Sequence, residues 1–107
     1  MDELSGILFI AETPLGFSVR VTRERWEMIT TFKHPVMAGC EAEIKSVLES
    51  PQEIRRSRAD ENVLLFYRQR EERRWVCAVC KRSDLDAFLI TAYPTDAIKE
   101  GEAIWPS

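Results

Sequence analysis

The sequence predicts an α+β protein in which two N-terminal helices pack on one face of a twisted, mainly antiparallel four-stranded sheet. In the first half of the chain, apolar residues recur at helical spacing, and in the second half they form short strand-like runs. Short polar segments join the consecutive runs of the second half, which favours antiparallel hairpins. A short N-terminal hairpin and a short C-terminal helix complete the predicted architecture.

The first predicted elements are two short strands, residues 8–11 and 17–21, joined by a turn that contains proline and glycine. Thr22 can then cap a helix that extends to about Lys33, because a threonine hydroxyl can accept a hydrogen bond from the first helical turn. The apolar stripe of this helix is Trp26, Ile29 and Phe32, flanked by Met28.

Proline residues set the predicted limits of both helices. Pro35 ends the first one, because the residue before a proline disfavours helical geometry. A second predicted helix covers residues 36–49 and ends before Pro51. Its apolar stripe is Ile44, Val47 and Leu48.

Four strands are predicted after Pro51, followed by a short helix that begins near Thr95. The strands cover residues 54–58, 63–69, 75–81 and 87–93.

The composition, 45% hydrophobic and 31% charged, is typical of a soluble globular protein, and 107 residues predict one domain. No apolar run approaches the length of a membrane span, and the acidic start of the sequence does not resemble a signal peptide. We therefore expect a cytoplasmic protein.

Positive charge gathers in one part of an acidic chain. The formal net charge is -3, yet residues 52–82 hold nine arginine and lysine residues against five acidic ones, a balance of +4. Eight of the nine are arginine, whose planar guanidinium suits phosphate. This distribution favours an anionic substrate, although long cationic side chains also solvate exposed strands.

The three cysteines are Cys40, Cys77 and Cys80. Cys77 and Cys80 have the C-x-x-C spacing of zinc sites, but residues three apart on a strand point to opposite faces. The chain offers Cys40 and a single histidine, His34, as further ligands, and neither has a zinc-knuckle spacing. Buried cysteines are therefore favoured over a metal site, and no metal or cofactor is predicted.

Two hydroxyls interrupt an otherwise apolar strand near the C-terminus. By alternation, Thr91 and Tyr93 would share a face with Leu89. Both residues are common in strands and can simply pack there, but they can also line a site at the rim of a sheet. The opposite face would carry Phe88, Ile90 and Ala92.

His34, the arginines and this hydroxyl pair together match the needs of metal-free RNA cleavage. That reaction needs a proton acceptor for the ribose 2'-hydroxyl, cationic donors for the phosphorane and a proton donor for the leaving oxygen. Imidazole can act in either proton transfer near neutral pH.

The order of these features resembles small phage and toxin-type members of the barnase/EndoU/colicin/RelE-like nuclease superfamily. The resemblance covers about residues 17 to 105 and implies a single nuclease-like domain, residues 1–107, that acts as a metal-independent ribonuclease. The matching features are a helix, His34-Pro35, a second helix, Pro51-x-x-Ile54, Tyr67-Arg68, the strand at 75–79 and the strand at 90–93.

The resemblance implies that His34 transfers protons and that Thr91 and Tyr93 belong to a hydroxyl-bearing final strand. Arg68 follows Tyr67 at the position of an aromatic-basic pair and is the favoured catalytic arginine. Alternation places these two side chains on opposite faces unless a bulge intervenes, so Arg58 is the second choice. The predicted substrate-binding residues are Arg58, Arg56 and Tyr67.

Two hypotheses follow. The first is a toxin-type RNA endonuclease, with RNA as its substrate and a cognate antitoxin or immunity protein as a possible partner. The second is a non-catalytic RNA-binding or protein-interaction module of the same fold, because the chain has one histidine as an obvious proton shuttle. No membrane partner is predicted, and the oligomeric state stays open.

Overall fold

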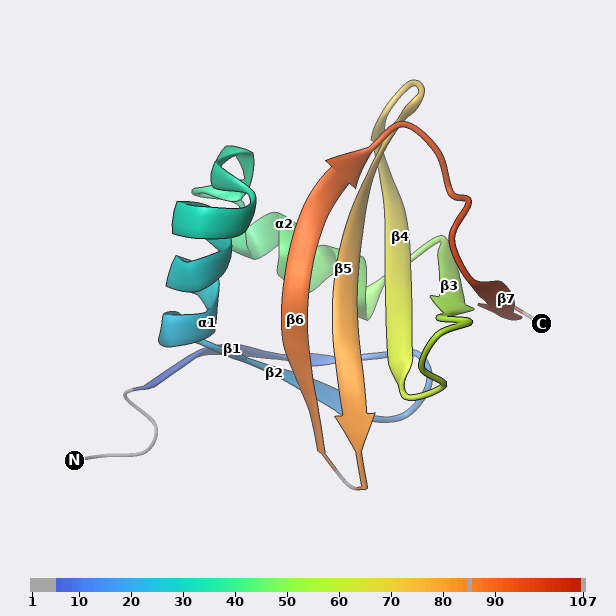
Figure 1. Ribbon diagram of the computed structural model, residues 1–107, viewed down its shortest axis with the longest axis horizontal. Helices are drawn as coiled ribbons and strands as arrows, with labels where there is room; N and C mark the ends of the chain where they lie inside the picture. The colour runs from blue at the N-terminus through green and yellow to red at the C-terminus, as the bar shows by residue number, and fades with distance from the viewer. Residues whose placement is uncertain (1–5, 85, 107) are drawn as a thin grey trace.

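The computed structural model describes residues 6–84 and 86–106. In this part of the chain seven strands form one sheet in the order β1-β2-β6-β5-β4-β3-β7 (Figure 1). Neighbouring strands are antiparallel except for β2 and β6, which are parallel. The strands are β1 (Ile7–Glu12), β2 (Ser18–Thr22), β3 (Glu53–Arg56), β4 (Val63–Glu71), β5 (Arg74–Ser83), β6 (Asp86–Thr95) and β7 (Glu102–Trp105).

The helical segments lie between β2 and β3 in the chain. Figure 1 shows α1 beside β6, and α2 crosses one face of the sheet. Among the described residues, no helix is long and apolar enough to cross a membrane. The helical elements are α1 (Arg23–Met28), the π-helical turn η2 (Ile29–Lys33), the 3-10 turn η3 (Pro35–Met37) and α2 (Glu41–Glu49).

The chain is an α+β protein, but the predicted architecture of two helices on a four-stranded sheet is wrong. The four predicted strands correspond to β3, β4, β5 and β6. The N-terminal hairpin joins the same sheet, because β2 pairs with β6 where Arg20 lies opposite Phe88. The predicted C-terminal helix does not form: residues 96–101 are irregular, and β7 then adds to the edge of β3.

The first helix has the predicted cap but a different apolar face. The Thr22 hydroxyl accepts a hydrogen bond from the Arg25 amide at 3.1 Å, and Trp26 and Ile29 are buried. Phe32, expected in the same stripe, is 80% exposed. The helix widens to i→i+5 hydrogen bonding in η2, which changes the angle between successive side chains and turns Phe32 away from the core.

The second helix begins later than predicted, at Glu41 instead of residue 36. Gly39 has a φ of +83°, a conformation that glycine adopts readily and that breaks helical geometry between η3 and α2. The predicted stripe of α2 is confirmed, because Ile44, Val47 and Leu48 are all buried. The helix ends at Glu49, before Pro51.

The sheet has two faces with different surroundings. The helix-side face contacts α1 and α2 and carries the main core, to which β4 contributes Leu64 and Phe66. The opposite side, called the second face below, carries a smaller cluster. That cluster consists of Leu65, Tyr67, Cys77 and Val79, with Val63, Ile90, Tyr93 and Ile98 packed against it.

A bulge in β6 changes the predicted alternation. Val79 pairs with Thr91 and Cys80 with Leu89, so Ile90 is an extra residue in β6. Leu89 therefore belongs to the main core, whereas Thr91 lies opposite Val79 of the second face. The prediction that Leu89 shares a face with Thr91 is wrong.

Candidate functional site

His34 and Tyr93 come together at the edge of the second face. His34 lies between η2 and η3 with a non-helical backbone, and its amide donates a hydrogen bond of 2.7 Å to the Ile29 carbonyl. Its ring packs on the Tyr93 ring with 5.5 Å between the centroids and 39° between the planes. The break before Pro35 thus positions an imidazole beside the hydroxyl-bearing part of β6.

Tyr93 belongs to a polar cluster with Tyr67 and Cys77. Cys77 pairs with Tyr67 on β4 and with Tyr93 on β6, so the three side chains form one row across the second face. Burial raises the pKa of the Cys77 thiol to about 12 and raises the pKa of both tyrosine phenols above their ordinary values. At neutral pH all three groups are protonated, so they can donate hydrogen bonds but cannot act as bases.

A cleft of about 500 Å³ adjoins this cluster. Its apolar floor comes from β4, β5 and Tyr93, and its rim contains Arg58 and Lys99. An Nη atom of Arg58 donates a hydrogen bond of 3.4 Å to the Gly101 carbonyl across the rim. The full lining is Ser57, Arg58, Ala59, Val63, Leu65, Val79, Tyr93, Lys99, Glu100 and Gly101.

Arg68 and Arg56 lie on the helix-side face, away from Tyr93. Arg68 pairs with Val76 of the main core, and an Nη atom of Arg68 donates a hydrogen bond of 2.7 Å to the Ser50 carbonyl. Arg56 pairs with Leu64, which is also in that core. The structure therefore brings Tyr93 together with His34, Tyr67 and Arg58, and separates it from Arg68 and Arg56.

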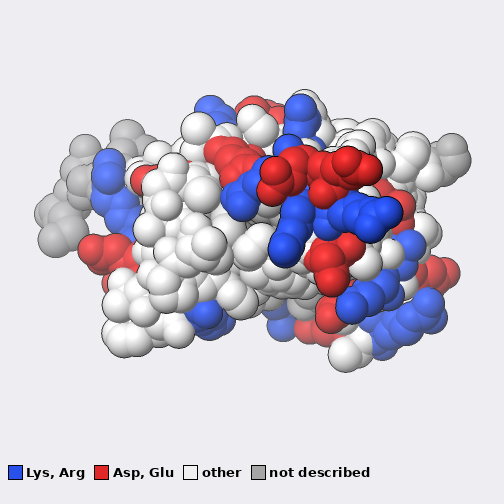
Figure 2. All heavy atoms as spheres, turned by 90° about the horizontal axis from the view of Figure 1, so that it is seen from above, with Lys and Arg blue, Asp and Glu red and all other residues white. Residues whose placement is uncertain are grey.

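The arginine-rich segment does not form a continuous basic surface. Figure 2 views the molecule from above. On the surface it shows, Lys and Arg are interleaved with Asp and Glu over one half, and the other half is largely uncharged. Ion pairs also neutralise several cations of this segment: Arg55 pairs with Glu53, Arg56 with Glu102, and Lys81 with Asp60.

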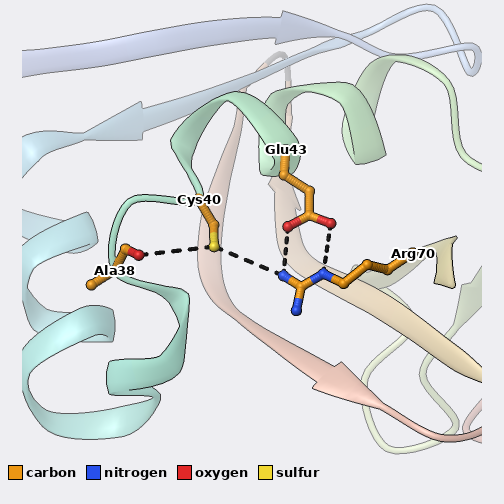
Figure 3. A network of polar contacts seen from close by, with 4 residues as sticks. All are labelled: Ala38, Cys40, Glu43 and Arg70. Carbon is orange, nitrogen blue, oxygen red and sulfur yellow. Dashed lines mark hydrogen bonds and ion pairs between the residues drawn. The ribbon is translucent and has the colours of Figure 1, made fainter.

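Arg70 has a structural contact of its own. Its Nε and Nη2 atoms donate hydrogen bonds of 2.8 and 2.5 Å to the Glu43 carboxylate, and Nη2 lies 3.8 Å from Cys40 Sγ (Figure 3). This two-bond contact ties β4 to α2, so Arg70 stabilises the packing of the helix.

Thr91 faces the same side as Tyr93, but its hydroxyl has no hydrogen-bond partner. Among the described residues, Thr91 Oγ1 and Glu41 Oε1 are the buried side-chain oxygens left without one. Leaving a buried hydroxyl unpaired costs about 1–3 kcal/mol. This atom is therefore a local source of instability beside the cluster.

The described residues contain no group of three His, Cys, Asp or Glu side chains arranged to hold a metal ion. Cys77 lies on the second face and Cys80 in the main core, so the C-x-x-C pair cannot chelate one ion. A larger hollow near the start of α1 combines Arg20 and Arg23 with two glutamates, and these opposite charges offset one another.

Lys99, Glu100 and Gly101 line the cleft but were not among the predicted site residues, because the sequence predicted a short helix beginning near Thr95. Gly101 has a φ of +81°, and a Cβ atom there would lie 2.6 Å from the Arg56 carbonyl oxygen. The Lys-Glu-Gly-Glu run at 99–102 would have indicated a turn in place of a helix, since glycine between charged residues is typical of a turn.

No family model matches the chain, and no curated protein or solved structure is significantly similar to it. The resemblance to the nuclease superfamily therefore stays a prediction.

Proposed function

We propose that the chain is a metal-independent RNA endonuclease whose site combines His34, Tyr93 and the adjoining cleft. The contact between the His34 and Tyr93 rings carries this proposal, because Tyr93 also lines the cleft that contains Arg58 and Lys99. These groups suit attack by the ribose 2'-hydroxyl on the neighbouring phosphate.

In this reaction His34 accepts the proton of the 2'-hydroxyl as the 2'-oxygen bonds to phosphorus. The bond from phosphorus to the 5'-oxygen then breaks, and the leaving oxygen takes a proton from water. The protonated His34 returns its proton to the resulting hydroxide, which restores the neutral imidazole. The products are a 2',3'-cyclic phosphate and a 5'-hydroxyl. Arg58 and Lys99 stabilise the charge that develops on the non-bridging oxygens.

Tyr93 has a supporting role in the proposal. Its phenol is protonated at neutral pH, and burial raises its pKa further, so it positions the imidazole through ring packing and does not act as the base. Arg58 replaces Arg68 as the phosphate ligand, since Arg58 lines the cleft and Arg68 lies on the other face.

The test incubates the protein with total RNA in EDTA and compares His34→Ala, Arg58→Ala and Arg68→Ala with the wild type. We expect cleavage with cyclic phosphate ends, abolished by His34→Ala and reduced about 100-fold by Arg58→Ala. Arg68→Ala should retain near-wild-type activity. Equal cleavage by the wild type and His34→Ala, or none by the wild type, would disprove the assignment.

Biological role needs a separate experiment. Expression in bacteria should arrest growth if the nuclease is a toxin, and His34→Ala should relieve the arrest. Growth arrest that persists with His34→Ala would contradict a nuclease-based toxin.

A second candidate is an RNA-binding module without catalysis. It is favoured by the protonated tyrosines, which leave His34 as the one evident proton shuttle at the site. RNA binding that Arg58→Ala weakens, without cleavage by any variant, would select this candidate.

A further inference from the structure

The cleft beside Tyr93 has an apolar floor as well as a cationic rim. Leu65 and Val79 are 5% and 8% exposed, so they form a closely packed floor of the cleft. The Tyr93 ring continues this floor. Arg58 and Lys99 stand at the rim with Glu100, which leaves a net charge of +1 there. The two kinds of surface lie within one space of about 500 Å³.

This combination suits a ligand with a flat apolar part and an attached anion. A free phosphate would contact the rim and leave the apolar floor in water. A nucleotide would use both surfaces, because its base can lie on an aromatic and aliphatic floor while its phosphate meets the cations. Bases inside a duplex are already stacked on both sides, so they would have to leave the stack to reach the floor.

We propose that this cleft binds one unpaired nucleotide of single-stranded RNA, with the base on Leu65, Val79 and Tyr93 and the phosphate at Arg58 and Lys99. The choice of RNA rests on the proposed function. The enzyme is then specific for single-stranded RNA. The bound nucleobase lies next to the Tyr93 ring, which packs on the His34 ring.

The binding test uses a fluorescent RNA heptanucleotide with 2'-O-methyl groups, which lacks the nucleophile and cannot be cleaved. Fluorescence anisotropy measures its dissociation constant alone, annealed to its complement, and in competition with inorganic phosphate. The single strand should bind about tenfold more tightly than the duplex, in the range expected when a base stacks on a protein ring. Phosphate should compete at least tenfold less effectively than a nucleoside 3'-monophosphate, because it lacks the stacking free energy of one base.

Charge reversal supplies a matched pair of variants. Lys99→Glu changes the rim, whereas Lys45→Glu makes the same change on α2, which packs on the helix-side face. Lys99→Glu should weaken binding of the single strand about fivefold or more and Lys45→Glu less than twofold. With two cations on phosphate, the logarithm of affinity should fall with the logarithm of salt concentration with a slope of about −1.4.

Equal affinity for single strand and duplex, or phosphate competing as well as the nucleotide, would overturn the proposal. So would equal effects of the two charge reversals. Failure of the proposed function gives a different result: selective binding of the single strand by a protein that cleaves no unmodified RNA. Cleavage that depends on His34 but is insensitive to Lys99→Glu would overturn the assignment of the phosphate to this cleft and leave the role of His34 intact.

Discussion

Replacing Glu43 by glutamine tests the two-bond contact that ties β4 to α2. The wild-type carboxylate accepts hydrogen bonds from two nitrogen atoms of Arg70, and both side chains are about one-third exposed (31% for Arg70 and 32% for Glu43). Glutamine keeps the size and one acceptor oxygen but removes the charge. Because solvent screens a pair that is this exposed, we expect a loss of about 0.5–1 kcal/mol in the free energy of unfolding.

The effect of Glu43→Gln should depend on pH. Hydrogen bonds from Arg70 lower the pKa of the Glu43 carboxyl from its ordinary value of 4.5. A lowered pKa in the folded state stabilises the protein above the unfolded-state value, and the contribution is lost as the pH falls through the folded-state value. The difference between wild type and variant should therefore be complete at neutral pH and shrink below pH 4.5.

Urea unfolding followed by tryptophan fluorescence at several pH values would measure this difference. A loss of this size corresponds to a fall in melting temperature of about 2–6 °C for a domain of this length. Glu49→Gln, an identical change at an exposed position of the same helix, serves as the control and should have little effect. Equal losses for both variants, or a difference that does not change with pH, would refute the role given to the Arg70 contact.

Three further experiments test other parts of the structure. Iodoacetamide at mildly alkaline pH should alkylate Cys40 in the folded protein and spare Cys77, whose thiol is buried with a pKa of about 12; mass spectrometry showing equal labelling would contradict this. Thr91→Val removes a buried hydroxyl without a partner among the described residues and should leave stability unchanged or raise it by about 1 kcal/mol in urea unfolding. Ile29→Ala should cost about 2–4 kcal/mol and Phe32→Ala less than about 0.5, and similar losses would contradict the π-helical turn.

Local signals in the sequence predicted much of the secondary structure. Thr22 caps α1, the stripe of α2 is buried, and the four predicted strands form as β3, β4, β5 and β6. Each of these signals acts over a few neighbouring residues. Phe32 was predicted wrongly because the spacing rule assumes a regular α-helix, and nothing in the local pattern indicates the wider turn. The pairing of β7 with β3 was missed because it joins residues about fifty positions apart.

The candidate site was predictable in part for the same reason. Alternation on an uninterrupted strand correctly separates Tyr67 from Arg68, but the bulge at Ile90 changes which neighbours Thr91 has. The proximity of His34 to Tyr93 depends on tertiary packing, which one sequence does not reveal.

The short parallel contact between β2 and β6 has a consequence for how the protein folds. The strands β4, β5 and β6 follow one another closely in the chain, so their pairing requires little loss of chain freedom. Arg20 and Phe88 are sixty-eight positions apart, and closing such a loop costs about 1.7 kcal/mol more than closing one of ten residues. We therefore expect the three-strand meander to form early and the N-terminal hairpin to dock late. In native hydrogen exchange, amides of β1 and β2 should open before those of β5, so the blue end of the ribbon in Figure 1 is the part that leaves the sheet first.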